Sequence, residues 1–323
     1  MNRYFKYTKA LLAAALLFPA GLYAQSYPHY TMFMYNKLIY NPGYAGSRDV
    51  TSINASYRNQ WTGLEGAPRT LNIAIDGPIG SYMKPFRKMA LGLGVNSEKI
   101  GVTDNTTLTG YYAFRIPMKK TVLSIGIQAG ISLYSARYSD LNAREPDQRL
   151  ANNIHNTVLP NVGPGIYWSG EHFYLGASIP NLLENYYDKD HKGTLRNDGG
   201  KQLRSYYLSG GYVFNLSDNV QLEPQVLVRY AGNGIYQLPW NSDFNLSFIF
   251  YDRLMLGATY RTDKSFAGII HIQATRRINI GYSYDYTTSE LNGYNNGTHE
   301  VVLGFDFIRD NKKYANPRFI KPF

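Results

Sequence analysis

The sequence predicts an all-β fold: a transmembrane outer-membrane β-barrel of about 14 antiparallel strands with a short N-terminal helical plug segment. Three observations support this fold: a leader suited to export, repeated segments in which every second residue is apolar, and connections that alternate between short and long. The repeat is clearest from Ile278 to Thr287, where isoleucine and tyrosine alternate with small or polar residues. A period of two places the apolar set on one face of a strand and the polar set on the other.

Residues 1–24 are predicted to be a secretory signal peptide. An apolar run over 10–18 is followed by small residues up to Ala24, and it is preceded by the basic residues Arg3, Lys6 and Lys9. The run is too short to cross a bilayer as a helix, which takes about 20 residues. The chain contains no cysteine, so after export it needs neither disulfides nor a thiol site.

Residues 25–48 do not alternate, and we expect them to form a plug or cap segment. They are typical of a short helix that ends at Asn41-Pro42-Gly43, because proline disfavours a helical conformation at the residue before it. Five aromatic side chains would be exposed to water if the segment were a free linker: Tyr30, Phe33, Tyr35, Tyr40 and Tyr44. The segment is therefore expected to fill the lumen or to close the periplasmic mouth, with a leading linker as the alternative.

Residues 49–308 are assigned to the transmembrane barrel. The alternation divides them into strands at 49–59, 69–76, 87–98, 106–116, 121–134, 158–168, 171–180, 203–214, 219–231, 238–250, 253–262, 265–274, 277–287 and 298–308. An even number of strands brings the first and the last to the same side of the membrane. Both chain termini are therefore expected in the periplasm, with residues 309–323 as a periplasmic C-terminal tail.

The connections give an independent test, because bacterial barrels have short periplasmic turns and longer outer loops. The predicted short turns are Pro117 to Lys120, Ser169-Gly170, Asn215 to Asp218, Tyr251-Asp252 and Thr275-Arg276, and the long outer loops are 135–157 and 181–202. Two connections depart from the rule, since the inner one at 77–86 is long and the outer one at Asp263-Lys264 is tight. Basic residues would gather on the periplasmic rim, where they either dock a partner or keep the turns soluble: Lys84, Arg87, Lys88, Lys119, Lys120, Arg253, Arg276 and Arg277.

The mature chain is expected to be basic and rich in tyrosine. Loss of the leader leaves 30 basic residues against 23 acidic ones, a formal charge of +7. An exported β-rich chain of this charge is expected to meet anionic lipid headgroups, glycan or acidic proteins, and no motif supports nucleic-acid binding. The 30 tyrosines suit membrane interfaces, where the ring lies among acyl chains and the hydroxyl reaches water. A soluble sandwich or propeller is the competing fold, but a soluble sandwich would not need so many strands with an apolar face of full membrane height.

The sequence gives little support to catalysis. Six histidines are scattered without ligand-like pairing, and neither Gly-x-Ser-x-Gly nor His-Glu-x-x-His occurs. His299 and Glu300 are adjacent, but on a strand their side chains point to opposite faces and cannot act on one atom. We therefore expect no enzymatic activity, no cofactor and no metal site. Polar residues in the lumen phase would line a pore or a hydrogen-bonded interior: Arg58, Glu223, Gln225, Arg229, Asp285, Glu300 and Asp306.

Short motifs near both ends of the chain resemble the PorP/SprF family of type IX secretion system outer-membrane proteins. They are Tyr40 to Gly46, Tyr57 to Trp61 with Gly63, His299-Glu300 with Leu303-Gly304, and Pro317-Arg318-Phe319. Gly43 departs from the family pattern, which often carries alanine there. The resemblance marks these residues as candidates for the contact between plug and wall: Asn41, Pro42, Gly43, Ala45, Gly46, Arg58, Gln60, Trp61, His299 and Glu300.

The resemblance implies an outer-membrane component that assists secretion and surface display of cognate cargo, such as gliding adhesins. The implied partners are a secreted cargo protein or surface adhesin, periplasmic secretion-ring or tether proteins, and outer-membrane lipid. Family members serve either as core parts of the secretion machine or as partners of gliding adhesins, and the sequence leaves both open. A channel for small or hydrophobic solutes is the alternative function, because a barrel of this size with an N-terminal plug suits that class too.

Overall fold

The computed structural model describes residues 29–79, 88–141, 153–187, 201–232 and 240–308. The predicted signal peptide and C-terminal tail lie outside the described residues, as do Lys84, Arg87, the motif Pro317-Arg318-Phe319 and the middle parts of both long outer loops. Among the described residues, no helix is long and apolar enough to cross a membrane.

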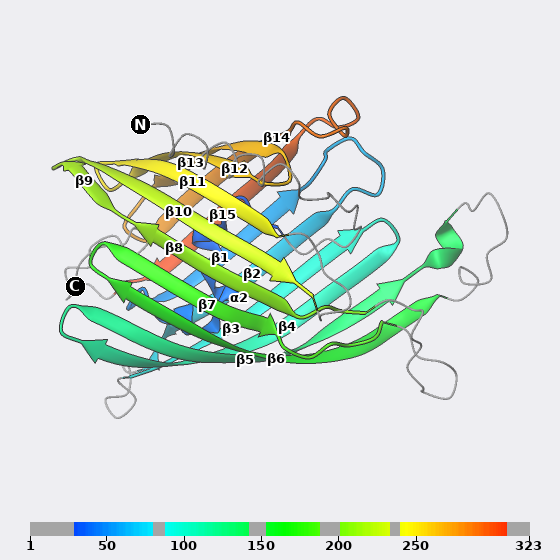
Figure 1. Cartoon of the computed structure of the whole chain (residues 1–323), viewed down its shortest axis with the longest axis horizontal. Helices are drawn as coiled ribbons and strands as arrows, with labels where there is room; N and C mark the ends of the chain where they lie inside the picture. Colours follow the sequence, from blue (N-terminus) through cyan, green and yellow to red (C-terminus); the bar gives the residue numbers. More distant parts are fainter. Residues whose placement is uncertain (1–28, 80–87, 142–152, 188–200, 233–239, 309–323) are drawn as a thin grey trace, which may run out of the picture.

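The described chain forms one closed antiparallel sheet (Figure 1). Its strands are β1 (Thr51–Asn59), β2 (Arg69–Pro78), β3 (Met89–Ile100), β4 (Thr103–Met118), β5 (Thr121–Ala136), β6 (Ile154–Gly170), β7 (Phe173–Asn181), β8 (Ser205–Tyr212), β9 (Phe214–Ser217), β10 (Val220–Ala231), β11 (Asn241–Phe250), β12 (Leu254–Arg261), β13 (Ser265–Gln273), β14 (Ile278–Thr287) and β15 (Thr298–Phe307). Both β8 and β9 pair with β10, so they are two halves of one barrel strand interrupted at Val213. The prediction of a 14-stranded barrel is confirmed.

The barrel closes between its first and last strands. β1 pairs with β2 on one side and with β15 on the other, in a register that joins Thr51 to Phe307 and Asn59 to His299. We call the pairing of β1 with β15 the seam. Because β1 and β15 are antiparallel, the wall starts and ends at the same end of the barrel, as the even strand count predicted.

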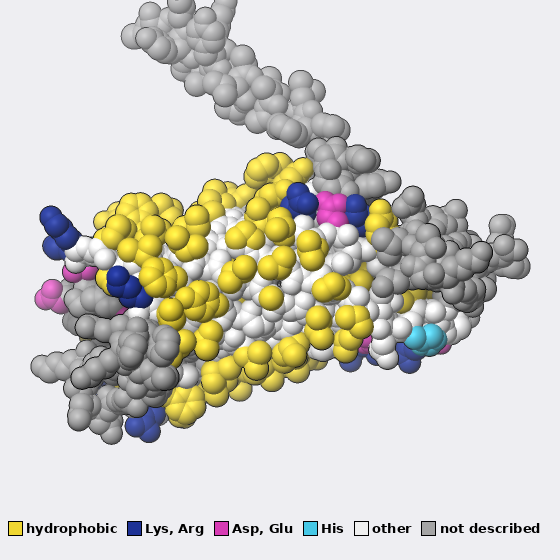
Figure 2. Space-filling view, turned by 90° about the horizontal axis from the view of Figure 1, so that it is seen from below, with side chains coloured by type: hydrophobic (Ala, Val, Ile, Leu, Met, Phe, Trp, Pro, Cys, Tyr) yellow, Lys and Arg dark blue, Asp and Glu magenta, His cyan; other side chains and the backbone are white. Residues whose placement is uncertain are grey.

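The two faces of the wall differ as a lipid environment requires. On β14, Asn279 and Ser283 are fully buried and Asp285 is nearly so, while the apolar and aromatic side chains that alternate with them are 40–48% exposed. Those outward residues are Ile278, Ile280, Tyr282, Tyr284 and Tyr286. Figure 2 shows the resulting belt of hydrophobic side chains, with charged groups toward its two ends. An apolar exterior around a polar interior is the pattern of a membrane barrel.

The two ends of the barrel differ in their connections (Figure 1). One end carries tight turns, such as Lys119-Lys120 between β4 and β5, and the other carries the long loops. Three predicted turns differ from the structure, because Pro117-Met118 still belongs to β4, Ser169-Gly170 belongs to β6, and Asn215 to Ser217 lie in β9. The prediction also missed one tight outer connection, Gly101-Val102, where Gly101 adopts a positive φ of 55°.

Residues 29–50 lie inside the barrel, and we call them the lumenal segment (Figure 1). It contains η1 (Phe33–Tyr35), α2 (Lys37–Tyr40) and η2 (Pro42–Tyr44). α2 ends before Asn41, whose φ of −144° and ψ of 111° are extended, as expected for a residue that precedes proline. The helical plug of the predicted fold is thus present, although its helices are each one turn or less.

An apolar core lies between the lumenal segment and the wall. One cluster joins Tyr30, Met32, Phe33, Met34 and Tyr40 of the segment to Leu227, Ile249, Met255, Ile269 and Val302 of the wall. A second joins Leu38 and Ala45 to Ala74, Ala90, Tyr111 and Ala113. The lumen is therefore packed by side chains much as the interior of a soluble domain is.

Candidate functional site

The long-loop end of the lumen holds a buried network around Thr31. Its backbone N–H donates to Glu300 Oε2 at 2.7 Å, and its hydroxyl donates to Asp285 Oδ2 at 2.5 Å. Arg58 joins all three groups, donating to Thr31 Oγ1 at 2.7 Å, to Asp285 Oδ2 at 2.7 Å and to Glu300 Oε2 at 3.0 Å. Arg58, Asp285 and Glu300 lie near the long-loop ends of β1, β14 and β15, so Thr31 lies at that end as well.

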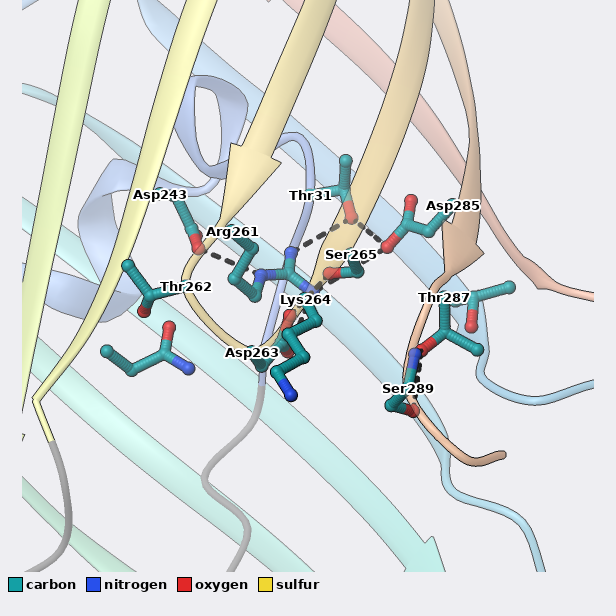
Figure 3. A network of polar contacts seen from close by, with 12 residues as sticks. Thr31, Asp243, Arg261, Thr262, Asp263, Lys264, Ser265, Asp285, Thr287 and Ser289 are labelled. Atoms are coloured by element: carbon teal, nitrogen blue, oxygen red, sulfur yellow. Dashed lines mark hydrogen bonds and ion pairs between the residues drawn. The ribbon is translucent and has the colours of Figure 1, made fainter. Parts of the chain in front are cut away.

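The network continues along the wall to Arg261 on β12 and Asp243 on β11, which Figure 3 shows, and then to Arg229 on β10. Arg261 donates to Thr31 Oγ1 at 3.2 Å and to Asp243 Oδ1 at 2.8 Å. Arg229 donates to the same Asp243 oxygen at 2.7 Å. Three arginines thus face three carboxylates, all of them buried. Pairing of this kind offsets the large cost of removing each charge from water.

Several polar atoms of this network have no hydrogen-bond partner among the described residues. They are Arg58 Nε, Arg229 Nε and Nη1, Asp243 Oδ2 and Asp285 Oδ1. Buried polar atoms of this kind are commonly satisfied by ordered water. His29 lies beside the network, where burial and the charges of Arg229, Arg261 and Arg58 lower the pKa of its imidazole. A neutral His29 leaves the balance of three positive and three negative charges undisturbed.

The Asn41-Pro42-Gly43 turn rests on glycines of the wall. The Asn41 side chain accepts from the Gly43 N–H at 2.9 Å and donates to the Ile166 carbonyl on β6 at 2.9 Å. A Cβ atom added at Gly126 would lie 2.3 Å from Gly43 N, and one at Gly165 would lie 2.3 Å from Asn41 Oδ1. Such distances are far below van der Waals contact, so the backbone of the turn approaches the wall only because these positions lack side chains. We call Gly126, Gly165 and Gly176, on β5, β6 and β7, the glycine cradle.

A second ionic group holds the segment close to β1, at the end with the short turns. The Gly46 N–H donates to Asp76 Oδ2 at 2.8 Å. Arg48 pairs with Asp76 at 3.3 Å and with Asp306 at 3.6 Å. Gly46 has a φ of 69°, and a Cβ there would lie 2.4 Å from Ala90 Cβ. Glycine is therefore required at this turn by both its backbone conformation and its neighbours.

Between these two ends, the segment contacts the wall through stacking and hydrogen bonds. Tyr35 stacks on His271 with ring centroids 4.2 Å apart. Asn36 Oδ1 accepts from Ser56 Oγ at 3.1 Å. Lys37 places its Nζ 3.6 Å from the centre of the Tyr174 ring, a cation–π distance. Burial lowers the pKa of Lys37 to about 8, an effect that Glu223 opposes and Arg48 reinforces.

The structure divides the ten motif residues into three groups. Five of them, Asn41, Pro42, Gly43, Ala45 and Gly46, lie in the lumenal segment near the short-turn end. Arg58 and Glu300 meet in the network around Thr31.

Of the other three, Gln60 and Trp61 lie in the loop that follows β1, and His299 lies on the outward face of β15. The Gln60 N–H donates to the Pro68 carbonyl, and the Trp61 N–H donates to Thr298 Oγ1. His299 Nδ1 lies 2.8 Å from the Tyr282 hydroxyl on the outward face. His299 and Glu300 therefore do point to opposite faces.

Sequence reasoning missed several residues of this interface. Thr31, Asp243, Arg261 and Asp76 were not singled out, although the last three occupy the lumen phase of their strands. The glycine cradle was missed too, and its signal is an inward glycine on each of three consecutive strands. Among the described residues, no group of three or more His, Asp or Glu side chains could hold a metal ion. The interface can therefore position the lumenal segment and fix it against the barrel wall.

A protein-family model described as "Type IX secretion system membrane protein PorP/SprF" matches residues 22–305. No curated protein matches the chain. Among solved structures, the chain is similar to the NanC porin, with 10% identity, a TM-score of 0.41, and coverage of 80% of this chain and 100% of that one. It is also similar to the TodX deltaS2S3 mutant monoaromatic hydrocarbon channel, with 8% identity, a TM-score of 0.43, and coverage of 83% and 93%. At these scores the likeness carries no information about activity.

Proposed function

The chain belongs to the PorP/SprF family of type IX secretion system membrane proteins, and we propose that it assists the secretion and surface display of cognate cargo as a filled barrel rather than as a conduit. Family membership makes it an outer-membrane component of that system. The proposal adds the role within it: the protein holds a secreted partner, such as a gliding adhesin, at the cell surface.

The observation that carries this proposal is the lumenal segment. It contacts the wall on every side, from Asn96 on β3 and the glycine cradle to His271 on β13 and Glu300 on β15. It also extends from Thr31 near one end of the barrel to Val50 at the start of β1 near the other. A barrel packed by its own chain is well suited to hold a fixed shape against a partner.

The two rims suggest where partners bind. The short-turn rim carries exposed basic side chains that suit acidic periplasmic partners, such as components of the secretion ring or a tether: Lys88, Lys119, Lys120, Arg253, Arg276 and Arg277. The long-loop rim faces the cell exterior, where cargo arrives. Exposed charges contribute mainly to association rate and orientation rather than to affinity.

Deletion of the gene tests the proposal. We expect one or a few secreted proteins to disappear from the surface proteome of the deletion strain and to return with the wild-type gene, while nutrient uptake stays unchanged. Mass spectrometry of proteins released by protease from intact cells measures the effect. An unchanged surface proteome would contradict the proposal.

The channel alternative makes an opposite prediction. In planar bilayers, the purified protein is expected to show little conductance, and removal of residues 29–46 is expected to raise it. A wild-type protein that conducts as well as this deletion variant, together with a growth defect on one nutrient in the deletion strain, would favour the channel.

A further inference from the structure

Two outer loops are joined above the seam (Figure 1). Residues 60–68 connect β1 to β2, and residues 288–297 connect β14 to β15. The Thr62 N–H donates to the Gly297 carbonyl at 2.8 Å, and the Asn296 N–H donates to the Thr62 carbonyl at 2.7 Å. The hydroxyl of Thr298 also accepts from Trp61 N–H at 3.0 Å. These bonds make one ordered surface, which we call the seam platform.

The backbone of the seam platform is held in an unfavourable conformation. Trp61 has a φ of 47°, a region that bulky side chains rarely occupy. Such a conformation persists only when surrounding bonds impose it, and such residues cluster at binding and catalytic sites. Here the bonds that hold Trp61 and Thr62 reach across to the loop before β15. The platform is also continuous with the lumen, since Trp61 follows Arg58 by three residues and Thr298 precedes Glu300 by two.

The composition of the platform is that of a protein-recognition surface. Tyr294 is 74% exposed and Leu64 is 36% exposed, while Trp61 is half-buried. Most of the remaining platform residues are small or polar: serine, threonine, asparagine and glycine. Antibody combining sites use the same mixture, in which aromatic anchors supply contact area and small polar residues supply adaptable hydrogen bonds.

The charge of the platform selects the partner. Its ionisable side chains are Glu65 and Glu290, both exposed, and the two loops contain neither lysine nor arginine. Arg69, which follows the first loop, and Lys264, whose carbonyl accepts from Thr288, are exposed at the border of the platform, so the two carboxylates give the loops a local negative charge. A local negative charge disfavours anionic lipid headgroups and favours a basic group on a protein.

We infer that the seam platform is the docking surface for a basic face of the secreted protein that this barrel serves. The inference rests on the proposed function and adds to it the site and the chemistry of the contact. Tyr294 and Leu64 supply the anchoring contacts, and Glu65 and Glu290 orient the partner. The seam supports the platform from below, so docking occurs on the part of the rim where the first and last strands meet.

Photo-crosslinking in intact cells tests the inference. Tyr294→p-benzoylphenylalanine is the probe, and Tyr251→p-benzoylphenylalanine is its matched control, because Tyr251 is equally prominent at 69% exposed but lies at the short-turn end. We expect residue 294 to crosslink to a secreted protein that residue 251 does not capture. The Glu65→Lys/Glu290→Lys background is expected to reduce this product by about tenfold or more. Asp218→Lys is the control charge reversal at the opposite rim.

Three results would overturn the inference. The first is crosslinking at residue 294 only to lipopolysaccharide, or to the same species as at residue 251. The second is an unchanged yield in the charge-reversed background. The third is normal cargo display in Tyr294→Ala and Glu65→Lys/Glu290→Lys cells whose heat-modifiable barrel is at wild-type abundance, while the deletion strain loses cargo. That third result would leave the proposed function standing, whereas a deletion strain with an unchanged surface proteome would remove both.

Discussion

The lumenal segment is held near the long-loop end by a network of buried charges, whereas near the short-turn end the ion pairs of Arg48 are joined by a close backbone approach to glycines of the wall. Around Thr31, charged groups of Arg58, Asp285 and Glu300 meet with defined geometry. At Asn41-Pro42-Gly43, the backbone approaches the glycine cradle more closely than any side chain would allow. The network around Thr31 positions the segment through hydrogen bonds and ion pairs, which are broken when one partner is removed. The glycine cradle positions the segment through steric fit, which is lost when a side-chain atom is added.

The largest loss is expected from Arg58→Ala. It leaves Asp285 and Glu300 buried without their shared cation, which costs about 3–5 kcal/mol of unfolding free energy. Urea unfolding of the barrel refolded in detergent measures the loss, and Arg69→Ala, at an exposed position on β2, is the control. If the two variants unfold at the same urea concentration, the charged network does not anchor the segment.

A smaller but clear loss is expected from Gly126→Ala. The new methyl group would meet the backbone of Pro42 and Gly43, and overpacking of this kind costs about 1–3 kcal/mol. Gly268→Ala is the matched control, because a Cβ at Gly268 meets nothing within 4 Å. Protease sensitivity of the segment should rise in the first variant alone. Equal sensitivity in both variants would show that the cradle has room for a side chain.

Asn41→Ala is expected to cost about 1–2 kcal/mol, because it removes one hydrogen bond within the turn and one to the Ile166 carbonyl. The same unfolding measurement detects the loss. Asn215→Ala, at an exposed position on β9, serves as the control. Combined with Gly126→Ala, the effect should be less than additive, since both changes release the same turn. Full additivity would mean that the turn and the cradle act independently.

A pH effect is expected from Lys37, between the two ends. The folded protein holds the pKa of this amine at about 8, below its ordinary value of 10.5. Below pH 8, both folded and unfolded chains carry the proton. Between pH 8 and 10.5, the Lys37 amine is protonated in a larger fraction of unfolded chains than of folded ones. The free energy of unfolding should therefore rise with pH in this range. Lys37→Met should abolish this rise, while Lys119→Met at the exposed rim should retain it.

The smallest effect is expected from His299→Ala. This side chain lies on the outward face against Tyr282 and Tyr284, so its loss should change stability by less than about 0.5 kcal/mol. His271→Ala, which removes the ring stacked on Tyr35, should cost more. A loss at His299 as large as that at Arg58 would mean that the motif pair acts as one unit despite facing opposite ways.

The sequence predicted the strands of the barrel wall better than the contacts of the lumenal segment inside it. Alternation identifies a strand and its polar face, and it correctly predicts that Arg58, Arg229, Asp285 and Glu300 face the lumen. It does not reveal which inward groups meet, because that depends on the register between distant strands and on the path of the lumenal segment. The sequence predicted both chain termini at the short-turn end. β1 begins and β15 ends there, but Thr31, close to the first described residue, lies near the opposite end, because the lumenal segment runs through the barrel before β1 begins. The positive φ of Trp61 was not predicted either, because no local sequence pattern indicates it.

The route of the lumenal segment has a consequence for how the protein assembles. Arg58 and Glu300 are separated by 242 positions in the chain, yet both form hydrogen bonds with Thr31. If the barrel closed first, the lumenal segment would have to thread lengthwise into a lumen that it fills tightly. If the strands instead assemble around the segment, no threading is needed. We therefore expect the segment to find its place on the early strands first and to gather the late ones, so that the barrel is completed around its own template.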